Sequence, residues 1–142
     1  MPARVLLLLA LCGPACLVEV AQASPASAPH AAACVAALKA RETSLAQSVK
    51  SGNPAQSELL EVVRSGIAII GTQYLAGLQE AEARQLLAAA EQDFLALPPT
   101  AAEQRQAECQ REGSTLYQQA SPLERALITN SAERRIRRLT AA

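Results

Sequence analysis

Apolar residues recur every three or four positions along most of the chain, which is the spacing of one face of an α-helix. The first such segment runs from about His30 to Lys50, and its apolar stripe comprises Cys34, Leu38, Leu45 and Val49. Arg41 falls on the same stripe, where only its aliphatic stem can be buried. Gly52 follows as the glycine that ends the helix.

The second patterned segment is the longest, and it runs from Pro54 to Leu97. Asn53 before Pro54 is typical of an N-cap followed by proline at the first helical position. A single helix of this length would extend about 66 Å. Gly77 lies inside it, and glycine costs about 1 kcal/mol relative to alanine in a helix. We therefore expect either one bent helix or a break near Gly77.

Two capping boxes, which begin at Thr100 and Ser121, mark the last two helices. The first of these helices is expected to end at about Ala120 and the second at about Leu139. No segment alternates with the period of a β-strand. The pattern predicts an all-α fold, a small bundle of about four helices, in which short links favour antiparallel neighbours.

The first 23 residues have the pattern of a secretory signal peptide, with Arg4 before an apolar core and cleavage expected between Ala23 and Ser24. The apolar stretch is shorter than the roughly 20 residues of a membrane span. Two alternatives stay open: an uncleaved anchor, and a lipid attached to Cys16. We expect a periplasmic protein with a flexible mature N-terminus at residues 24–29 and a single helical domain over residues 30–142.

Composition narrows the class of protein further. Of 142 residues 31 are alanines, whereas only three are aromatic, which argues against a β-sandwich or β-barrel. The chain has 13 basic and 13 acidic residues, so it lacks the excess of positive charge that is typical of a nucleic-acid-binding protein. We expect no nucleic-acid partner.

Cys34 and Cys109 are the two cysteines that remain after cleavage, and an oxidising compartment predicts one disulfide between them. Two free thiols are the alternative. The bond would close a loop of about 75 residues, worth about 4 kcal/mol at most in the chain-entropy model. Such a bond would compensate for an alanine-rich core that removes little apolar surface from water. Gly113, one turn from Cys109, is expected to let the bridged helix come close.

Candidate catalytic chemistry is sparse. His30 is the only histidine, and it is expected before the first ordered turn, where no fixed partner orients it as a general base. No spacing matches a c-type haem, di-iron or zinc site or a glycine-rich phosphate loop. We predict no catalytic residue, metal site or cofactor, and hence no enzyme.

Carboxylates cluster between Glu80 and Glu112, where paired acids would suit glycoside hydrolysis. Acidic residues on helices are more often a solvated face. Helical pairing favours this interpretation, because Glu80 and Arg84 are four residues apart and Glu108 and Arg111 are three apart.

Charge divides along the chain. Residues 24–121 carry seven basic and ten acidic side chains, whereas residues 122–142 carry five basic and two acidic ones. Four of the basic residues are close together near the end, Arg134, Arg135, Arg137 and Arg138. Arginines in the last turns of a helix complement its macrodipole, and Glu133 is positioned to pair with Arg137. We expect their replacement by alanine to leave thermal unfolding nearly unchanged.

The same arginines are a candidate patch for an anionic partner, either a phospholipid or lipopolysaccharide headgroup or an acidic envelope protein. The sequence therefore predicts a non-catalytic binding or structural module of the cell envelope, associated with a membrane only peripherally or through a lipid on Cys16. The alternative is a periplasmic stress chaperone, a holdase that exposes apolar helix faces.

Overall fold

The computed structural model describes residues 26–141, and within them the chain forms helices and no strand. The helices are α1 (Ala28–Lys50), α2 (Gln56–Leu75), α3 (Glu80–Leu95), α4 (Pro99–Gln119) and α5 (Pro122–Thr140). The predicted all-α class is confirmed, but the number of helices is five and not about four. The predicted signal peptide and Cys16 lie outside the described residues.

The additional helix arises from a break at Gly77 in the long predicted segment. Gly77 has a φ of +100°, a conformation that side-chain-bearing residues rarely adopt. Its N–H donates to the carbonyl of Tyr74, and the N–H of Leu78 donates to that of Gln73. These two bonds make a Schellman motif, which satisfies the last carbonyls of α2 and turns the chain toward α3.

The same motif ends α1. Gly52, with a φ of +85°, donates to the carbonyl of Val49, and Asn53 donates to that of Ser48. The prediction for Gly52 is confirmed, but Asn53 does not cap the next helix. Its backbone belongs to the end of α1, and α2 begins only at Gln56.

The other helix starts agree with the sequence in part. Ser121 and Glu124 form the predicted capping box, with the Ser121 N–H donating to the Glu124 carboxylate at 2.7 Å. These bonds lower the pKa of Glu124 below its ordinary value. Thr100 is not an N-cap, because Pro99 takes the first helical position that suits proline. In α1, Ser27 caps the helix, which begins at Ala28, two residues before the expected start.

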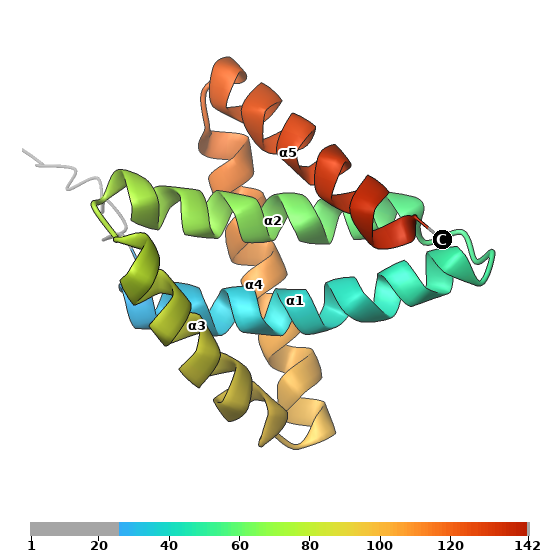
Figure 1. The fold of residues 1–142 in the computed structure, drawn as a ribbon, viewed down its shortest axis with the longest axis horizontal. Helices are drawn as coiled ribbons and strands as arrows, with labels where there is room; N and C mark the ends of the chain where they lie inside the picture. The colour runs from blue at the N-terminus through green and yellow to red at the C-terminus, as the bar shows by residue number, and fades with distance from the viewer. Residues whose placement is uncertain (1–25, 142) are drawn as a thin grey trace, which may run out of the picture.

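The helices form three layers (Figure 1). The antiparallel pair α1 and α2 makes the middle layer, α4 crosses one face of it, and α3 and α5 cross the other. The short links at Pro98 and Ser121 do not make antiparallel neighbours of the helices they join. Instead α3, α4 and α5 pack mainly against α1 and α2, whose apolar faces offer more surface to cover.

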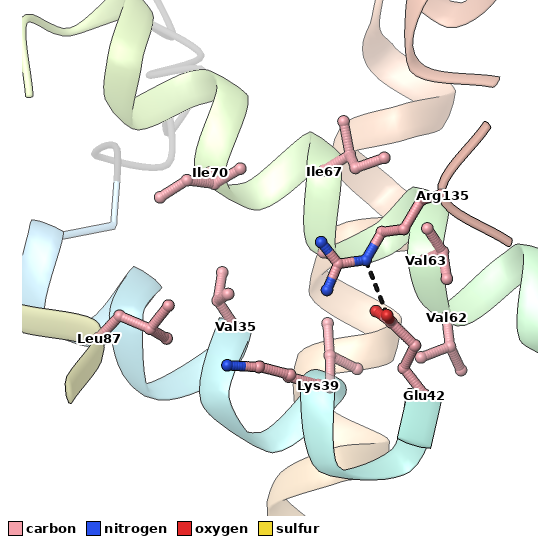
Figure 2. Close-up of a pocket in the computed structure, with 11 residues that line it drawn as sticks. Val35, Lys39, Glu42, Val62, Val63, Ile67, Ile70, Leu87 and Arg135 are labelled. Atoms are coloured by element: carbon pink, nitrogen blue, oxygen red, sulfur yellow. Dashed lines mark hydrogen bonds and ion pairs between the residues drawn. The ribbon is translucent and has the colours of Figure 1, made fainter. Parts of the chain in front are cut away.

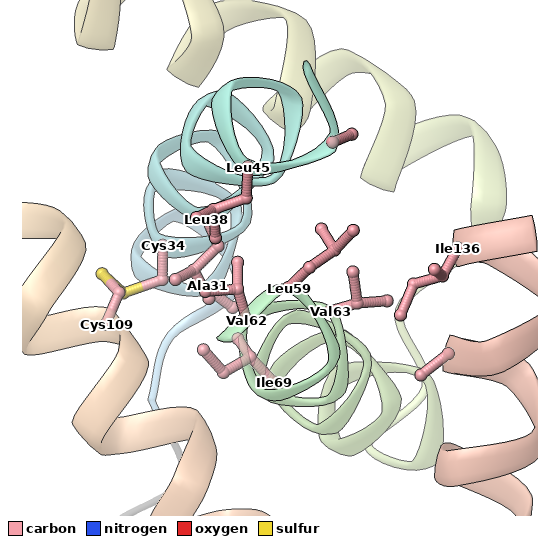
Figure 3. Packing of buried hydrophobic residues seen from close by; sticks show 12 residues of the cluster. Ala31, Cys34, Leu38, Leu45, Leu59, Val62, Val63, Ile69, Cys109 and Ile136 are labelled. Carbon is pink, nitrogen blue, oxygen red and sulfur yellow. A yellow bond between two sulfur atoms is a disulfide. The ribbon is translucent and has the colours of Figure 1, made fainter. Parts of the chain in front are cut away.

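The core lies between α1 and α2 and extends to α4 and α5 (Figure 3). Its largest fully buried apolar side chains are Leu38, Leu59, Val62 and Ile69. Half of the buried apolar residues are alanines, which allow close helix packing but remove little surface from water. No helix within residues 26–141 combines the length and apolar content needed to cross a membrane.

The predicted disulfide is present. Cys34 on α1 and Cys109 on α4 are bonded, with their Cα atoms 5.2 Å apart, so the covalent tie joins the middle layer to the helix that crosses it. Gly113 permits a close approach, but of a different helix than expected. A Cβ atom there would lie 2.5 Å from the carbonyl oxygen of Ser65, so the close neighbour is α2 rather than α1.

Candidate functional site

The four arginines near the end of α5 do not share one environment. Arg134, Arg137 and Arg138 are exposed, whereas Arg135 is partly buried. Within the part of the chain described, none of the three exposed arginines is in an ion pair, and the expected pair of Glu133 with Arg137 is not formed. Arg134 donates only to the hydroxyl of Ser131, at 3.3 Å.

The exposed arginines share one face of α5 with two leucines. At about 100° per residue, Leu123, Leu127, Arg137 and Arg138 all lie within about 60° of Arg134 around the helix axis. Ala132 and Ile136, which are buried, lie on the opposite side. The leucine side chains are 71% and 58% exposed. We call these three arginines and two leucines the outer face of α5, and it contains no carboxylate.

Arg135 points away from the outer face and toward α1. Figure 2 shows its guanidinium directed at Glu42, and its Nε donates to Glu42 Oε1 at 2.7 Å. The Glu42 side chain is only 8% exposed, so Arg135 supplies the counter-charge of a buried carboxylate. Arg135 is therefore a packing residue of the fold and not part of an open cationic patch.

The ion pair lies at one end of a shallow groove between α3 and α5 (Figure 2). Its floor is formed by α1 and α2, and Leu87 of α3 lies at the other end. The groove has a volume of about 190 Å³, below the 300–1,000 Å³ of cavities that hold drug-sized ligands. Lys39 at its rim pairs with Glu91 of α3, so both cations beside the groove already have partners.

Another interhelical polar contact lies where α2, α4 and α5 meet. The Tyr117 hydroxyl is 2.9 Å from Thr129 Oγ1 and accepts a bond from Arg64 at 3.5 Å. The Arg64 guanidinium also lies over the Tyr117 ring, 4.8 Å from its centre. The hydrogen bond with Thr129, followed by the influence of Arg64, lowers the pKa of Tyr117.

His30 is the residue whose sequence-based interpretation changes most. It lies in the first turn of α1, not before it, and its Nε2 is 2.8 Å from Glu112 Oε2 on α4. The expectation that this histidine has no fixed partner is therefore wrong. The pair lies directly beside the disulfide, since Cys34 Sγ is 3.8 Å from the same nitrogen.

The sequence-based predictions missed two side-chain pairs, Glu42 with Arg135 and His30 with Glu112, although the position of one member of each pair on its helix indicated that it faces the interior or the disulfide. Glu42 lies four residues after Leu38 and three before Leu45, so it falls on the apolar stripe of α1 and needs a buried partner. Glu112 lies three residues after Cys109, on the helix face that the disulfide turns toward His30. Neither partner was predictable without the tertiary fold.

The remaining charged residues behave largely as a solvated surface. Glu80 pairs with Arg84 as expected. Glu108 instead accepts a bond from Gln104 at 3.0 Å, and in residues 26–141 it forms no ion pair with Arg111. Arg41, expected to extend outward from its stripe, pairs with Glu58 across the α1–α2 hairpin.

Comparison of the chain with family models, with curated proteins and with solved structures finds no match in any of the three.

Proposed function

We propose that this protein is an exported, non-catalytic binding module of the cell envelope. It attaches peripherally to anionic lipid headgroups, phospholipid or lipopolysaccharide, through the outer face of α5. The observation that carries the proposal is the exposure of three arginines without carboxylate partners on the same face as two exposed leucines. The disulfide supports an oxidising compartment, such as the periplasm, after removal of the signal peptide.

The chemistry of the outer face suits a phosphate-rich surface. Arginine presents a planar fork of donors that matches phosphate, and it keeps its charge at all physiological pH values. Each basic side chain near an anionic bilayer contributes about 1 kcal/mol of attraction. The leucines add apolar area that can enter the boundary between headgroups and acyl chains.

The test is vesicle binding by the mature protein, residues 24–142. We expect binding to phosphatidylglycerol vesicles and little to phosphatidylcholine vesicles. The Arg134→Ala/Arg137→Ala/Arg138→Ala variant should bind about 100-fold more weakly at low salt, from three contributions of about 1 kcal/mol. Leu123→Ser/Leu127→Ser should weaken the binding that persists at high salt, where charge attraction is screened.

The matched control is Arg84→Ala/Arg105→Ala/Arg111→Ala, which removes the same charge from exposed positions on α3 and α4. It should bind nearly as the unmodified protein does. Equal loss in both triple variants would show a general charge effect, and binding to neutral vesicles at the same affinity would contradict the proposal. If the protein binds no lipid vesicle but binds an acidic envelope protein through the same arginines, the partner is that protein and not a lipid headgroup.

One observation favours the holdase as a second candidate. Leu75, Leu95 and Leu123 are 82%, 76% and 71% exposed, and they lie at the end of α2, at the end of α3 and in the first turn of α5. A holdase would use such residues to suppress aggregation of a denatured client without any vesicle. Suppression by the folded protein that is lost when these leucines become serine would favour this candidate over the lipid-binding module.

A further inference from the structure

Four side chains with metal-ligating chemistry meet where α1 and α4 cross. His30 precedes Cys34 by four residues on α1, and Glu112 follows Cys109 by three residues on α4. Residues three or four apart lie on the same face of a helix. The disulfide turns these two faces toward each other. The ligand atoms of His30, Cys34 and Glu112 lie within 4.8 Å of one another, and Cys109 joins them through its bond to Cys34.

The distances between three of the ligand atoms, those of His30, Cys34 and Glu112, are close to those around a zinc ion. Cys34 Sγ lies 3.8 Å from His30 Nε2 and 3.9 Å from Glu112 Oε2, and the last two atoms are 2.8 Å apart. Tetrahedral zinc with ordinary bond lengths sets sulfur about 3.6 Å from nitrogen or oxygen, and nitrogen about 3.4 Å from oxygen. Shifts of about half an ångström would bring these three atoms into zinc geometry. Cys109 Sγ takes the fourth position only after the disulfide is broken and the two sulfurs separate by more than an ångström.

We propose that reduction of the Cys34–Cys109 disulfide converts this cluster into a zinc site with Cys34, Cys109, His30 and Glu112 as ligands. A dithiol reductant supplies two electrons and two protons, becoming a disulfide itself and leaving two thiols on the protein. Zinc then displaces the two thiol protons and binds both thiolates, the imidazole and the carboxylate.

The oxidised protein lacks enough donors for the same ion. Its sulfurs are uncharged and bonded to each other, which leaves only His30 and Glu112 as good ligands. Reduction also separates the sulfurs to van der Waals contact, close to the spacing of about 3.8 Å between two thiolates on one zinc. Both cysteines are buried, but His30 and Glu112 are partly exposed and give the ion a route from solvent.

As a consequence, a zinc ion replaces the disulfide as the link between α1 and α4. Reduction removes the covalent bond between α4 and α1, and zinc bound by two ligands from each helix would link the two helices again. Because zinc binds the folded arrangement and not the separated helices, its binding free energy stabilises the reduced fold.

The experiment is zinc binding by the mature protein, oxidised or reduced with a phosphine, measured by competition with a chromogenic chelator. We expect one equivalent of zinc bound by the reduced protein and none by the oxidised one. Cobalt should give the thiolate charge-transfer and visible bands of tetrahedral coordination. His30→Ala and Glu112→Gln should each weaken zinc binding at least tenfold. Glu108→Gln, one turn away on the same face of α4, is the matched control and should not.

Two results would overturn the proposal. The first is a reduced protein that stays helical by circular dichroism but binds no zinc. The second is unchanged affinity in the His30→Ala/Glu112→Gln variant, which would show binding by thiols alone. Should the reduced chain unfold without metal, zinc must restore its helicity, and failure to do so would equally contradict the proposal.

Discussion

Arg134 and Arg135 are adjacent and chemically identical, but their surroundings give them different roles. Arg134 is exposed on the outer face of α5. Arg135 donates at 2.7 Å to Glu42, whose carboxylate is almost fully withdrawn from water. Removing one partner of such a pair leaves the other charge buried without compensation. The sequence-based expectation that all four arginines are neutral for thermal unfolding therefore does not extend to Arg135.

We predict that Arg135→Ala lowers the free energy of unfolding by about 1–3 kcal/mol, because Glu42 loses its counter-charge. The value is below that of a fully buried pair, since the Arg135 side chain is 42% exposed and water can partly replace it. Arg134→Ala should change the free energy by less than about 0.5 kcal/mol. Urea denaturation measures both. Addition of Glu42→Gln to Arg135→Ala should recover part of the loss, and equal small effects of the two arginine variants would refute this role.

At the scale of helices, a few glycines determine where the helices end and how closely they cross, and each glycine does so for a different reason. Gly52 and Gly77 supply the positive φ that ends α1 and α2. Gly113 lies inside α4 and provides space, because the backbone of Ser65 on α2 occupies the place of a side chain. Gly71 is also inside a helix, but a Cβ atom added there would meet no other atom within 4 Å. Two helical glycines thus differ only in what lies opposite them.

This contrast gives a paired prediction. Gly113→Ala should lower the free energy of unfolding, because forcing α2 and α4 apart costs about 1–3 kcal/mol and outweighs the gain in helix propensity. Gly71→Ala gains the propensity without a clash and should raise stability by up to about 1 kcal/mol. Thermal unfolding of both variants checks the prediction. A stabilising Gly113→Ala would mean that the crossing is looser than the structure shows.

At the scale of the molecule, the disulfide holds the layer formed by α4, whose own buried residues are small. The helix α4 crosses α1 and α2 and lies opposite α3 and α5 (Figure 1). Its buried residues are Cys109 and Gly113, so α4 contributes little apolar area to the core. The disulfide closes a chain separation of 75 residues and restricts the unfolded state accordingly.

We predict that Cys34→Ser/Cys109→Ser lowers the free energy of unfolding by about 2–4 kcal/mol. Urea titrations in the presence of a chelator, with and without reductant, measure this loss and keep it separate from zinc binding. Reductant should destabilise the unmodified protein by a similar amount and leave the double variant unchanged. A loss below about 0.5 kcal/mol would show that packing alone holds α4 in place.

Helix identity and most helix ends were readable from the chain, because they depend on neighbours within one or two turns. The capping box at Ser121 and the stop at Gly52 are such cases. Where two local signals competed, as proline and threonine did before α4, the start shifted by a residue or two. The disulfide was also predicted, on the expectation that cleavage leaves Cys34 and Cys109 as the two remaining cysteines, and the structure contains it.

Only the tertiary structure determined the contacts between residues that are far apart in the sequence. The pairing of Glu42 with Arg135, the meeting of His30 with Glu112 and the approach of Ser65 to Gly113 all follow from the crossing of α4 and α5 over the α1–α2 hairpin. Periodicity tells which side of a helix is apolar, but not which other helix covers it. That choice is made by the fit of whole surfaces against one another, and it determines which arginines and carboxylates remain free to bind a partner.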